Sequence, residues 1–566
     1  MRDLGRRDLL VGLGVTALGT ACVRLPDCPV CSAADDKKLL NIPNGARLKP
    51  ERCEVYAFDE VHRATATVYH PGSVEDIELI LKTASAEKRR VTPRGGGQAL
   101  YIQSLNDDII MRTTDPALSK IGSIQRDTEG YFIQTGAGAT WWDVVCAVAP
   151  YGLMPPSLVT AGWGTVGGTL ASDCVSRMSP IVGKEGRQIR RFHMVSPNGT
   201  TGWYGRKDKD DKLDVFRATI GGFGALGVVT SVEFDLMVAR SNPGVIDKHP
   251  CVMTRSTRHG NSFDWGTILR QLQSKTKTSR ERFRVNRRAH LGALPDVAHK
   301  AAVGGQDFDE VLAHTPEWSA LSIASFVQGA TMSANILEQR YVDPQQLRTL
   351  PSDAYVVDSG FPATALGMIE AWPTLGELAV EIGFPEGEFV DELFGWAFFL
   401  HNATQPAKMR AHAKNGRINF TQQSFALPSG DEANPDTRPM QRFMELVLAR
   451  LHEADIRPGN IDFLYIPADE FLMSASNGLN SFVVTVSFIE KNRDAFTPEA
   501  TDTLRALSHD CRTLGGRVHL VKGVYAERAD LRAMYGDAAA TLRKLKDIYD
   551  PNGVLKNQFF HEVFEA

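Results

Sequence analysis

The sequence predicts an α+β fold, and two kinds of pattern carry that prediction. Strand patterns alternate with helix patterns between residues 65 and 148, and strand patterns return between residues 462 and 522. In addition, turns at 94–100, 165–176 and 220–227 place paired glycines where extended chain ends. Because glycine has no Cβ, it lets backbone N–H groups come close to a bound anion. The three turns together predict a cradle for a large phosphorylated ligand.

The composition is that of an ordinary globular protein. The chain has 566 residues, of which 43% are apolar and 23% charged, so it can bury a sizeable core and should divide into two or more domains. The formal net charge is only −4. So small a charge favours neither a nucleic acid nor an anionic membrane surface as a partner. We therefore expect a small-molecule substrate and no nucleic-acid partner.

Residues 1–22 have the pattern of an export signal. Arg6-Arg7 precedes an apolar run at 9–19 that is too short to span a bilayer. This arrangement is typical of a twin-arginine signal, which exports folded proteins, and the alternative is a buried core segment. We expect an exported protein, periplasmic or at the cell surface. Cys22 lies in a context similar to a lipoprotein cleavage site, so a membrane is a partner only if Cys22 is lipidated.

The eight cysteines do not predict a metal site. Only Cys28 and Cys31 are close in sequence, within residues 23–51, which we expect to be a linker. No second close pair completes a zinc site. A local disulfide between these two cysteines, or two idle thiols, is favoured over a metal or redox centre. The other cysteines are too scattered to imply a disulfide framework.

The first glycine turn follows a β-turn-α unit. Residues 65–70 form a strand pattern, and Ser73 caps a helix whose apolar positions recur at helical spacing up to Ala84. Residues 89–93 then read as a strand that runs directly into the turn. Loops at strand ends often bind ligands, so this turn should contact the phosphorylated ligand. Its candidate binding residues are Arg94, Gly95, Gly96, Gly97, Gln98 and Ala99.

The second turn follows a similar unit. Residues 131–139 form a strand pattern with small residues at its end, and 140–143 cap a helix. We expect residues 165–169 to offer free backbone donors to a diphosphate. A glycine bend inside a tightly packed sheet is the alternative. The candidates here are Gly162, Thr165, Val166, Gly167, Gly168, Ser172, Ser176 and Arg177.

The third turn formally matches the dinucleotide fingerprint GxGxxG at residues 222–227. That fingerprint must open a helix, whereas residues 228–236 are β-branched and alternating, as in a strand. A nicotinamide-binding Rossmann unit is therefore rejected. We assign Gly222, Gly227 and Val228 to the same ligand site as the first two turns.

The second half of the chain is less regular. Strands are expected at 462–467 and 481–488, a helix at 440–452, and an exposed loop at 428–439. Side chains that could face a bound ligand are His401, Gln423, Asp462 and Tyr465, although each is more often a surface or satisfied core residue. Near the C-terminus, residues 516–522 form a strand pattern that ends in Lys522, and 542–549 form a helix stopped at 550–553.

The order and spacing of the three turns resemble the FAD-binding domain of PCMH-type flavoproteins, the vanillyl-alcohol-oxidase and p-cresol-methylhydroxylase class. The resemblance implies that residues 52–238 form two α+β subdomains with FAD between them. It also implies that residues 239–508 form a substrate domain with an antiparallel sheet and flanking helices. The ending, residues 509–566, is similar to that of aldonolactone oxidases and decaprenylphosphoryl-ribose oxidase, in which the chain returns to the FAD domain.

The resemblance also implies a chemistry. It assigns Lys522 as a catalytic cation near the flavin, where it would stabilise negative charge. Many relatives attach the flavin to a histidine where this chain has Gln98, so non-covalent FAD is expected unless a histidine of the second domain is used. The expected activity is oxidation of an alcohol carbon of a sugar, aldonolactone-type or lipid-linked sugar substrate, with oxygen or another acceptor. A flavin-dependent C=C reductase and a non-catalytic binding protein stay open.

Overall fold

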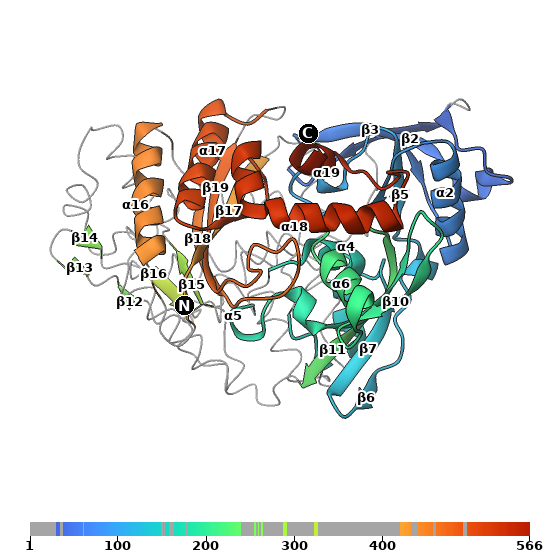
Figure 1. The fold of residues 1–566 in the computed structure, drawn as a ribbon, viewed down its shortest axis with the longest axis horizontal. Coiled ribbons are helices and arrows are strands. Elements are labelled where there is room, and N and C mark those ends of the chain that lie inside the picture. Colours follow the sequence, from blue (N-terminus) through green and yellow to red (C-terminus); the bar gives the residue numbers. More distant parts are fainter. Residues whose placement is uncertain are drawn as a thin grey trace, which may run out of the picture.

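A computed structural model shows the fold (Figure 1). It describes residues 30–33, 38–238 and 419–565 with short gaps, and short strands between 254 and 325. No helix in this part of the chain is long and apolar enough to cross a bilayer. Several sequence predictions lie outside the described residues, namely the export signal, Gly162, Ser176, Arg177 and His401.

The first sheet has five strands in the order β1-β2-β3-β5-β4. β1, β2 and β3 run antiparallel, whereas β3, β5 and β4 run parallel. Helix α2 (Val74–Ala86) connects β3 to β4 and begins at its N-cap Ser73, whose side chain accepts a hydrogen bond from the Asp76 N–H. The strands are β1 (Val30–Ala33), β2 (Glu51–Tyr56), β3 (Arg63–Tyr69), β4 (Val91–Arg94) and β5 (Ile109–Arg112).

Strand β1 corrects two expectations. It lies in the segment 23–51 that we expected to be a linker, yet it pairs with β2. Cys31 forms a disulfide with Cys53, because the antiparallel register places these two residues opposite each other. The expected local pair with Cys28 is therefore wrong. The spacing of cysteines in the sequence identifies only pairs that are close along the chain. The partner of Cys31 lies instead on the neighbouring strand β2.

The second sheet is antiparallel, in the order β10-β9-β11-β7-β6, with β8 paired to β11. A reciprocal capping box between Thr140 and Asp143 starts helix α3, as predicted. Helix α6 begins at Asp210, inside the charged run 207–212. The strands are β6 (Gln125–Asp127), β7 (Gly130–Gly136), β8 (Leu153–Met154), β9 (Ile189–Val195), β10 (Thr201–Gly205) and β11 (Val228–Val238), and the helices are α3 (Trp141–Val148), α4 (Val166–Ser172), α5 (Ser179–Val182) and α6 (Asp210–Thr219).

The third sheet has seven strands in the order β12-β16-β15-β18-β19-β17-β20 and is antiparallel where its pairing is described. Helices α16 (Arg438–Glu453) and α17 (Pro498–Thr513) lie beside it (Figure 1). β20 belongs to this sheet, although we expected residues 509–566 only to return to the FAD domain. The strands are β12 (Thr254–Arg255), β15 (Arg287–His290), β16 (Ser322–Ser325), β17 (Asn419–Pro428), β18 (Asn460–Ile466), β19 (Ser481–Glu490) and β20 (Arg517–His519).

After β20 the chain does return to the first half. Helix α18 (Arg528–Tyr549) crosses the molecule toward the first sheet (Figure 1). The Lys546 ammonium donates to the carbonyl oxygens of Ala225 at 3.0 Å and Leu555 at 2.7 Å. The side-chain amide of Asn557 donates to the Phe223 carbonyl at 2.9 Å. The C-terminal segment therefore holds the third glycine turn through hydrogen bonds to its backbone carbonyls.

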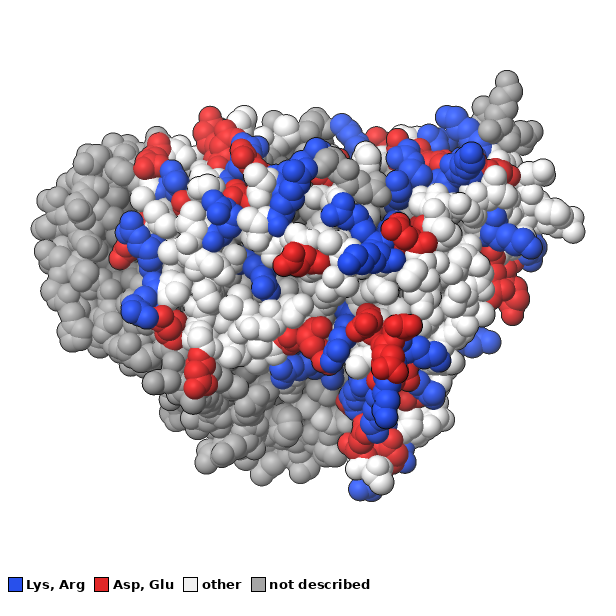
Figure 2. Space-filling model, in the orientation of Figure 1, with Lys and Arg blue, Asp and Glu red and all other residues white. Residues whose placement is uncertain are grey.

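The second and third sheets share one packed interior. Phe234 in β11, Phe425 in β17 and Leu542 in α18 belong to the same contiguous hydrophobic core. On the face that Figure 2 shows, basic and acidic side chains are interspersed among uncharged ones. The remaining elements are short: β13 (Arg258–His259), β14 (Ser262–Phe263), η2 (Gly45–Leu48), η3 (Ile102–Ser104), η4 (Pro116–Leu118), η6 (Glu185–Gln188), α19 (Gln558–Phe560) and η9 (His561–Glu565).

Candidate functional site

The three glycine turns meet at the short helix α4. The first turn contacts its start so closely that a Cβ on Gly95 would overlap the Thr165 hydroxyl. The third turn binds its end, where the N–H groups of Gly221 and Phe223 donate to the carbonyls of Leu170 at 3.0 Å and Ala171 at 2.8 Å. Turns that are far apart in sequence are therefore brought together around one helix, as a single cradle requires.

The backbone donors at the start of α4 are not free, which corrects our expectation for residues 165–169. The N–H groups of Val166 and Gly167 donate to the carbonyls of Ala139 and Ala137, at 2.9 and 2.8 Å. Gly168 N–H donates to the Thr165 hydroxyl at 3.3 Å. The segment between β7 and α3 and the N-cap side chain use these donors. Gly167 serves close packing, because a Cβ there would overlap Ala137.

Arg94 stabilises the first glycine turn through hydrogen bonds to neighbouring segments. Its guanidinium donates to the Tyr56 carbonyl at 2.7 Å and to the Ser104 hydroxyl at 2.7 Å, and the side chain is buried. Gly97 follows with a positive φ of 68°, and a Cβ on it would approach Arg94 Nη2 to 2.6 Å. Arg94 therefore shapes the turn that includes Gly96 and Ala99.

Gln98 lies at the tip of this turn. Its side-chain amide donates to the Gly96 carbonyl at 3.1 Å. Its Oε1 atom is buried and finds no hydrogen-bond partner among the residues that the structure describes. A buried acceptor without a partner is costly. The turn thus offers a ligand one acceptor in addition to its backbone.

The remaining candidates of the second and third turns pack against protein. A Cβ on Gly222 would overlap the Ala218 carbonyl, and one on Gly227 would overlap Met194. Val228 is buried in β11 opposite Val195. Ser172 donates to the carbonyl of Gly168 at 3.1 Å. These contacts fix the shape of the turns.

Lys522 lies in a turn and not in the strand we expected, because β20 ends at His519. Gln103 in η3 holds this turn, since its amide donates to the carbonyls of Leu520 and Lys522, both at 2.9 Å. The charge of Lys522 lowers the pKa of Cys174, although burial and the Glu185 charge outweigh it and raise that pKa. The backbone of Lys522 is therefore hydrogen-bonded to η3 in the first half of the chain. Its charge acts on Cys174, which follows α4.

His519 is a site residue that sequence reasoning missed. Burial, assisted by the charges of Lys184 and Lys522, lowers its pKa well below the usual value. The Val521 N–H donates to Nδ1 at 3.4 Å, so the neutral ring carries its proton on Nε2. That Nε2 is buried and has no partner in the described part of the chain. Its place three residues before Lys522 was the signal available in the sequence.

Of the other ligand-facing candidates, the structure describes the side chain of Gln423. Gln423 is a satisfied core residue, since its amide donates to the Ser508 hydroxyl at 2.5 Å and accepts from the Tyr525 N–H at 2.6 Å. The side chains of Asp462 and Tyr465 lie outside the described part of the structure. The Gln423 amide also donates to the Leu504 carbonyl at 3.1 Å, so this side chain faces α17.

Glu185 is a fully buried carboxyl beside α4. Its Oε1 accepts a hydrogen bond from the Thr169 hydroxyl at 2.5 Å, and the indole of Trp141 donates to the same hydroxyl at 2.8 Å. Its Oε2 has no partner among the described residues. Burial is the main cause that raises the pKa of Glu185 well above its usual value, the Thr169 hydrogen bond opposes it, and the Asp173 charge adds to it.

We expect Glu185→Gln to change how stability depends on pH. The raised pKa means that the folded protein binds the extra proton, so wild-type stability is full below the usual carboxyl pKa and falls as pH rises toward the raised value. The variant has no such proton, and the two curves should diverge by up to ~1.4 kcal/mol per pH unit in that window. Denaturant unfolding from pH 4 to 9 measures this, and parallel curves would contradict it.

The arrangement fits a flavin dinucleotide. The first turn approaches α4 at a position where only glycine fits, and buried atoms on Gln98, Glu185 and His519 lack partners within the described structure. These atoms lie on three segments that surround α4 or the Lys522 turn. Backbone N–H groups of the first glycine turn would suit a diphosphate, and the polar side chains would suit the edge of a heterocycle. The residues present therefore match the cofactor that the resemblance implies.

Part of the chain is similar to known FAD-binding proteins. Residues 65–204 match the family model described as "FAD binding domain". The chain is 28% identical over 173 residues to cytokinin dehydrogenase 9 of Oryza sativa subsp. japonica, covering 30% of this chain and 32% of that protein. It is 28% identical over 178 residues to decaprenylphosphoryl-beta-D-ribose oxidase of Mycolicibacterium smegmatis, covering 31% of this chain and 38% of that protein.

The fold and the site thus define an FAD-binding domain within an α+β protein. Residues 65–204 are similar to the FAD-binding domains of PCMH-type flavoproteins, and FAD is the cofactor. The matched region spans about a third of the length of the curated relatives. Cytokinin dehydrogenase 5 of Arabidopsis thaliana is similar over the same extent, at 25% identity over 173 residues, 30% of this chain and 31% of that protein.

Proposed function

We propose that the protein is an FAD-dependent oxidoreductase that oxidises an alcohol carbon of a sugar, aldonolactone-type or lipid-linked sugar substrate. The observation that carries the proposal is the position of the Lys522 turn. Gln103 ties this turn to the half of the chain that holds the first glycine turn, and its charge reaches Cys174 at the end of α4. These contacts support the proposal that Lys522 supplies a cation to the cofactor site.

The roles of the residues follow from their contacts. FAD, when bound, supplies the acceptor for a hydride from the substrate carbon. The backbone of residues 95–99 and the Gln98 amide would bind the cofactor, with Arg94 holding the turn in shape. Lys522 would stabilise negative charge, and the Nε2–H of His519 would donate a hydrogen bond to the ligand. His519 ends β20 and Lys522 lies in the turn that follows, so they would address the same end of the ligand.

We infer that the first and second sheets are the two subdomains between which FAD lies. The inference is supported by α4, which belongs to the second sheet's half but contacts the first glycine turn at Gly95. The third sheet would then be the substrate domain over the reacting end, because β20 leads directly into the Lys522 turn. Non-covalent binding is part of the proposal, since Gln98 has no nucleophilic nitrogen.

The experiment is to purify the protein and follow anaerobic bleaching of its flavin absorbance. The panel contains polyols, aldonolactones, a prenyl-phosphoryl sugar and a cytokinin, because relatives carry the last two substrates in their names. We expect bleaching by at least one hydroxylated compound and release of the flavin on acid precipitation. Bleaching by reduced nicotinamide alone favours a C=C reductase, and a colourless protein that ignores added FAD refutes the proposal.

We also propose that the protein is exported through Arg6-Arg7. The Cys31–Cys53 disulfide supports this, because structural disulfides persist in oxidising compartments. Changing both arginines to lysine should leave the protein in the cytoplasm with Cys31 and Cys53 reduced. Cell fractionation and thiol labelling measure both effects, and unchanged export would contradict the assignment.

A further inference from the structure

A buried ion cluster joins the end of α4 to the third sheet. The Lys184 ammonium pairs with the Asp173 carboxylate, and it lies 3.1 Å from Asp469 Oδ2. It also donates to the Ser474 hydroxyl at 2.5 Å, and that hydroxyl donates to Asp469 at 2.8 Å. The side chains of Lys184, Asp173 and Asp469 are each only 1% exposed. Asp173 follows α4, whereas Asp469 and Ser474 lie in the 467–480 loop between β18 and β19.

The cluster buries more negative than positive charge. Two carboxylates face one ammonium group, and Glu185 lies within electrostatic range of Asp173. Burial alone would lower the pKa of Lys184, but the Asp173 and Asp469 charges outweigh it and raise that pKa, so Lys184 stays charged. A buried ion group is weak as a source of stability, and its usual benefit is a fixed arrangement.

The cluster fixes the chain on both sides of Lys184. Asp173 Oδ1 accepts a hydrogen bond from the Gly186 N–H at 2.9 Å, and the Glu185 N–H donates to the Cys174 carbonyl at 3.1 Å. Asp173 also limits the third glycine turn, because a Cβ on Gly221 would come within 3.2 Å of its Cβ. Lys184 thus holds Asp173 and Cys174 against Glu185 and Gly186, and the Lys522 charge acts on Cys174 in the same place.

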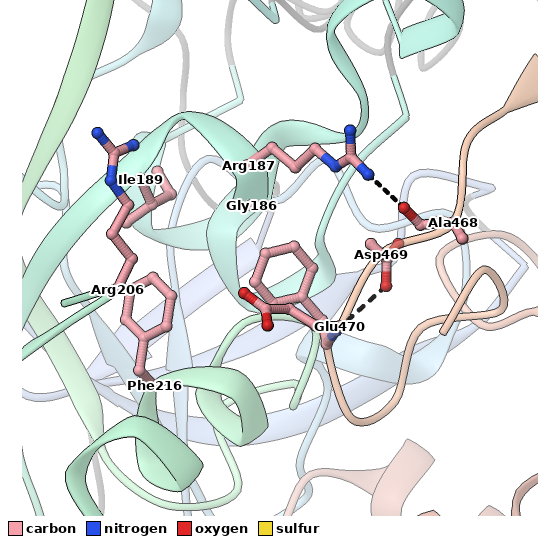
Figure 3. A pocket seen from close by; sticks show the side chains of 9 residues that line it. Gly186, Arg187, Ile189, Arg206, Phe216, Ala468, Asp469 and Glu470 are labelled. Atoms are coloured by element: carbon pink, nitrogen blue, oxygen red, sulfur yellow. Dashed lines mark hydrogen bonds between the residues drawn. The ribbon is translucent and has the colours of Figure 1, made fainter. Parts of the chain in front are cut away.

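Further contacts join the 467–480 loop to η6 and α6. A pocket of about 320 Å³ lies there, where η6 and α6 meet the 467–480 loop (Figure 3). Arg187 extends to the Ala468 carbonyl, and Arg217 pairs with Glu470. Phe471 packs so closely that a Cβ on Gly186 would approach its ring to 2.5 Å. The charged side chains around this pocket are engaged by protein, so it is part of the junction.

We propose that Lys184 is a positioning residue for the flavin site. Lys184 binds the 467–480 loop on one side and Asp173 on the other. It thereby fixes where the end of α4 and the third glycine turn lie relative to the Lys522 turn. The inference rests on the proposed function, because it concerns the same cofactor site. Lys184 contacts Asp173, Asp469 and Ser474, and it acts on the cofactor site through Asp173.

The test compares two variants with a matched control. Lys184→Met removes the cation, and the double variant Lys184→Met/Asp469→Asn removes one charge of each sign, which keeps the net charge of the cluster. The control is Arg190→Met. Arg190 is also a buried cation between two aspartates, Asp127 and Asp235, but it lies at the start of β9, whereas Val195 at the other end pairs with Val228 beside the third glycine turn.

The measured quantities are the FAD dissociation constant and the visible circular dichroism of the bound flavin. We expect both Lys184 variants to bind FAD about tenfold more weakly, equivalent to ~1.4 kcal/mol, with an altered flavin spectrum. Arg190→Met should stay within about twofold of wild type, because a difference of that size is only ~0.4 kcal/mol.

If Lys184→Met does not fold, the double variant tests whether Lys184 positions the flavin site. Wild-type affinity and an unchanged flavin spectrum in the double variant would overturn the inference while leaving the proposed function intact. An equal loss of affinity in Arg190→Met would overturn it too, since any buried ion cluster would then have the same effect. A wild-type protein that does not bind FAD fails the proposed function first and removes the inference with it.

Discussion

Gly95→Ala should weaken FAD binding by about 10- to 100-fold, the equivalent of ~1–3 kcal/mol of overpacking. The added Cβ would overlap the Thr165 hydroxyl. Thr165 is buried and its hydroxyl caps α4, so the overlap must push the first glycine turn away from the helix. Titration of the apoprotein with FAD, followed by quenching of flavin fluorescence, measures the change.

A double-variant comparison separates this overlap from general damage. Thr165→Ala removes the overlapping oxygen, so it should recover part of the affinity lost in Gly95→Ala. Gly202→Ala is the control, because a Cβ there meets no atom within 4 Å among the described residues. Equal affinity in Gly95→Ala and wild type would show that the contact between the first turn and α4 does not shape the cofactor site.

Lys522→Met should slow flavin reduction by substrate by about 100-fold, the usual effect of losing one charge-stabilising group in an active site. It should also lower the flavin reduction potential by about 30 mV or more, which corresponds to ~1.4 kcal/mol for two electrons. FAD binding should persist, because Gln103 holds this turn through backbone carbonyls and not through the Lys522 side chain.

The matched control for this prediction is Lys522→Arg, which keeps the positive charge. Its potential should stay near that of wild type, even if the larger guanidinium slows the substrate reaction. Stopped-flow reduction and a dye-based potential titration measure the two effects. A potential that does not move in Lys522→Met would place the ammonium away from the flavin.

The features that the sequence predicts well depend on residues that are neighbours along the chain. Ser73 caps α2 and Thr140 and Asp143 cap α3 because each cap is contained within four residues. The rejection of a Rossmann unit was correct for the same reason, since β11 follows the third glycine turn directly. Family resemblance then supplied the cofactor, which local pattern alone left as a phosphorylated ligand.

The features that it misses depend on which segments pack together. We expected the N–H groups of Val166 and Gly167 to be free, yet they donate to carbonyls of the chain before α3. Cys31 pairs with Cys53 through strand register. Lys184 reaches Ser474 across 290 positions of sequence, and no periodicity could have indicated that contact. Its isolated charge beside Glu185 gives no sign of burial.

Hydrogen–deuterium exchange of the protein with and without FAD tests most directly whether the turns around α4 hold the cofactor. We predict slower exchange on FAD addition in peptides that contain residues 95–99, 221–227 and 520–523, with little change in α16. FAD binding that protects none of these turns, or protects only α16 and its neighbours, would contradict the account.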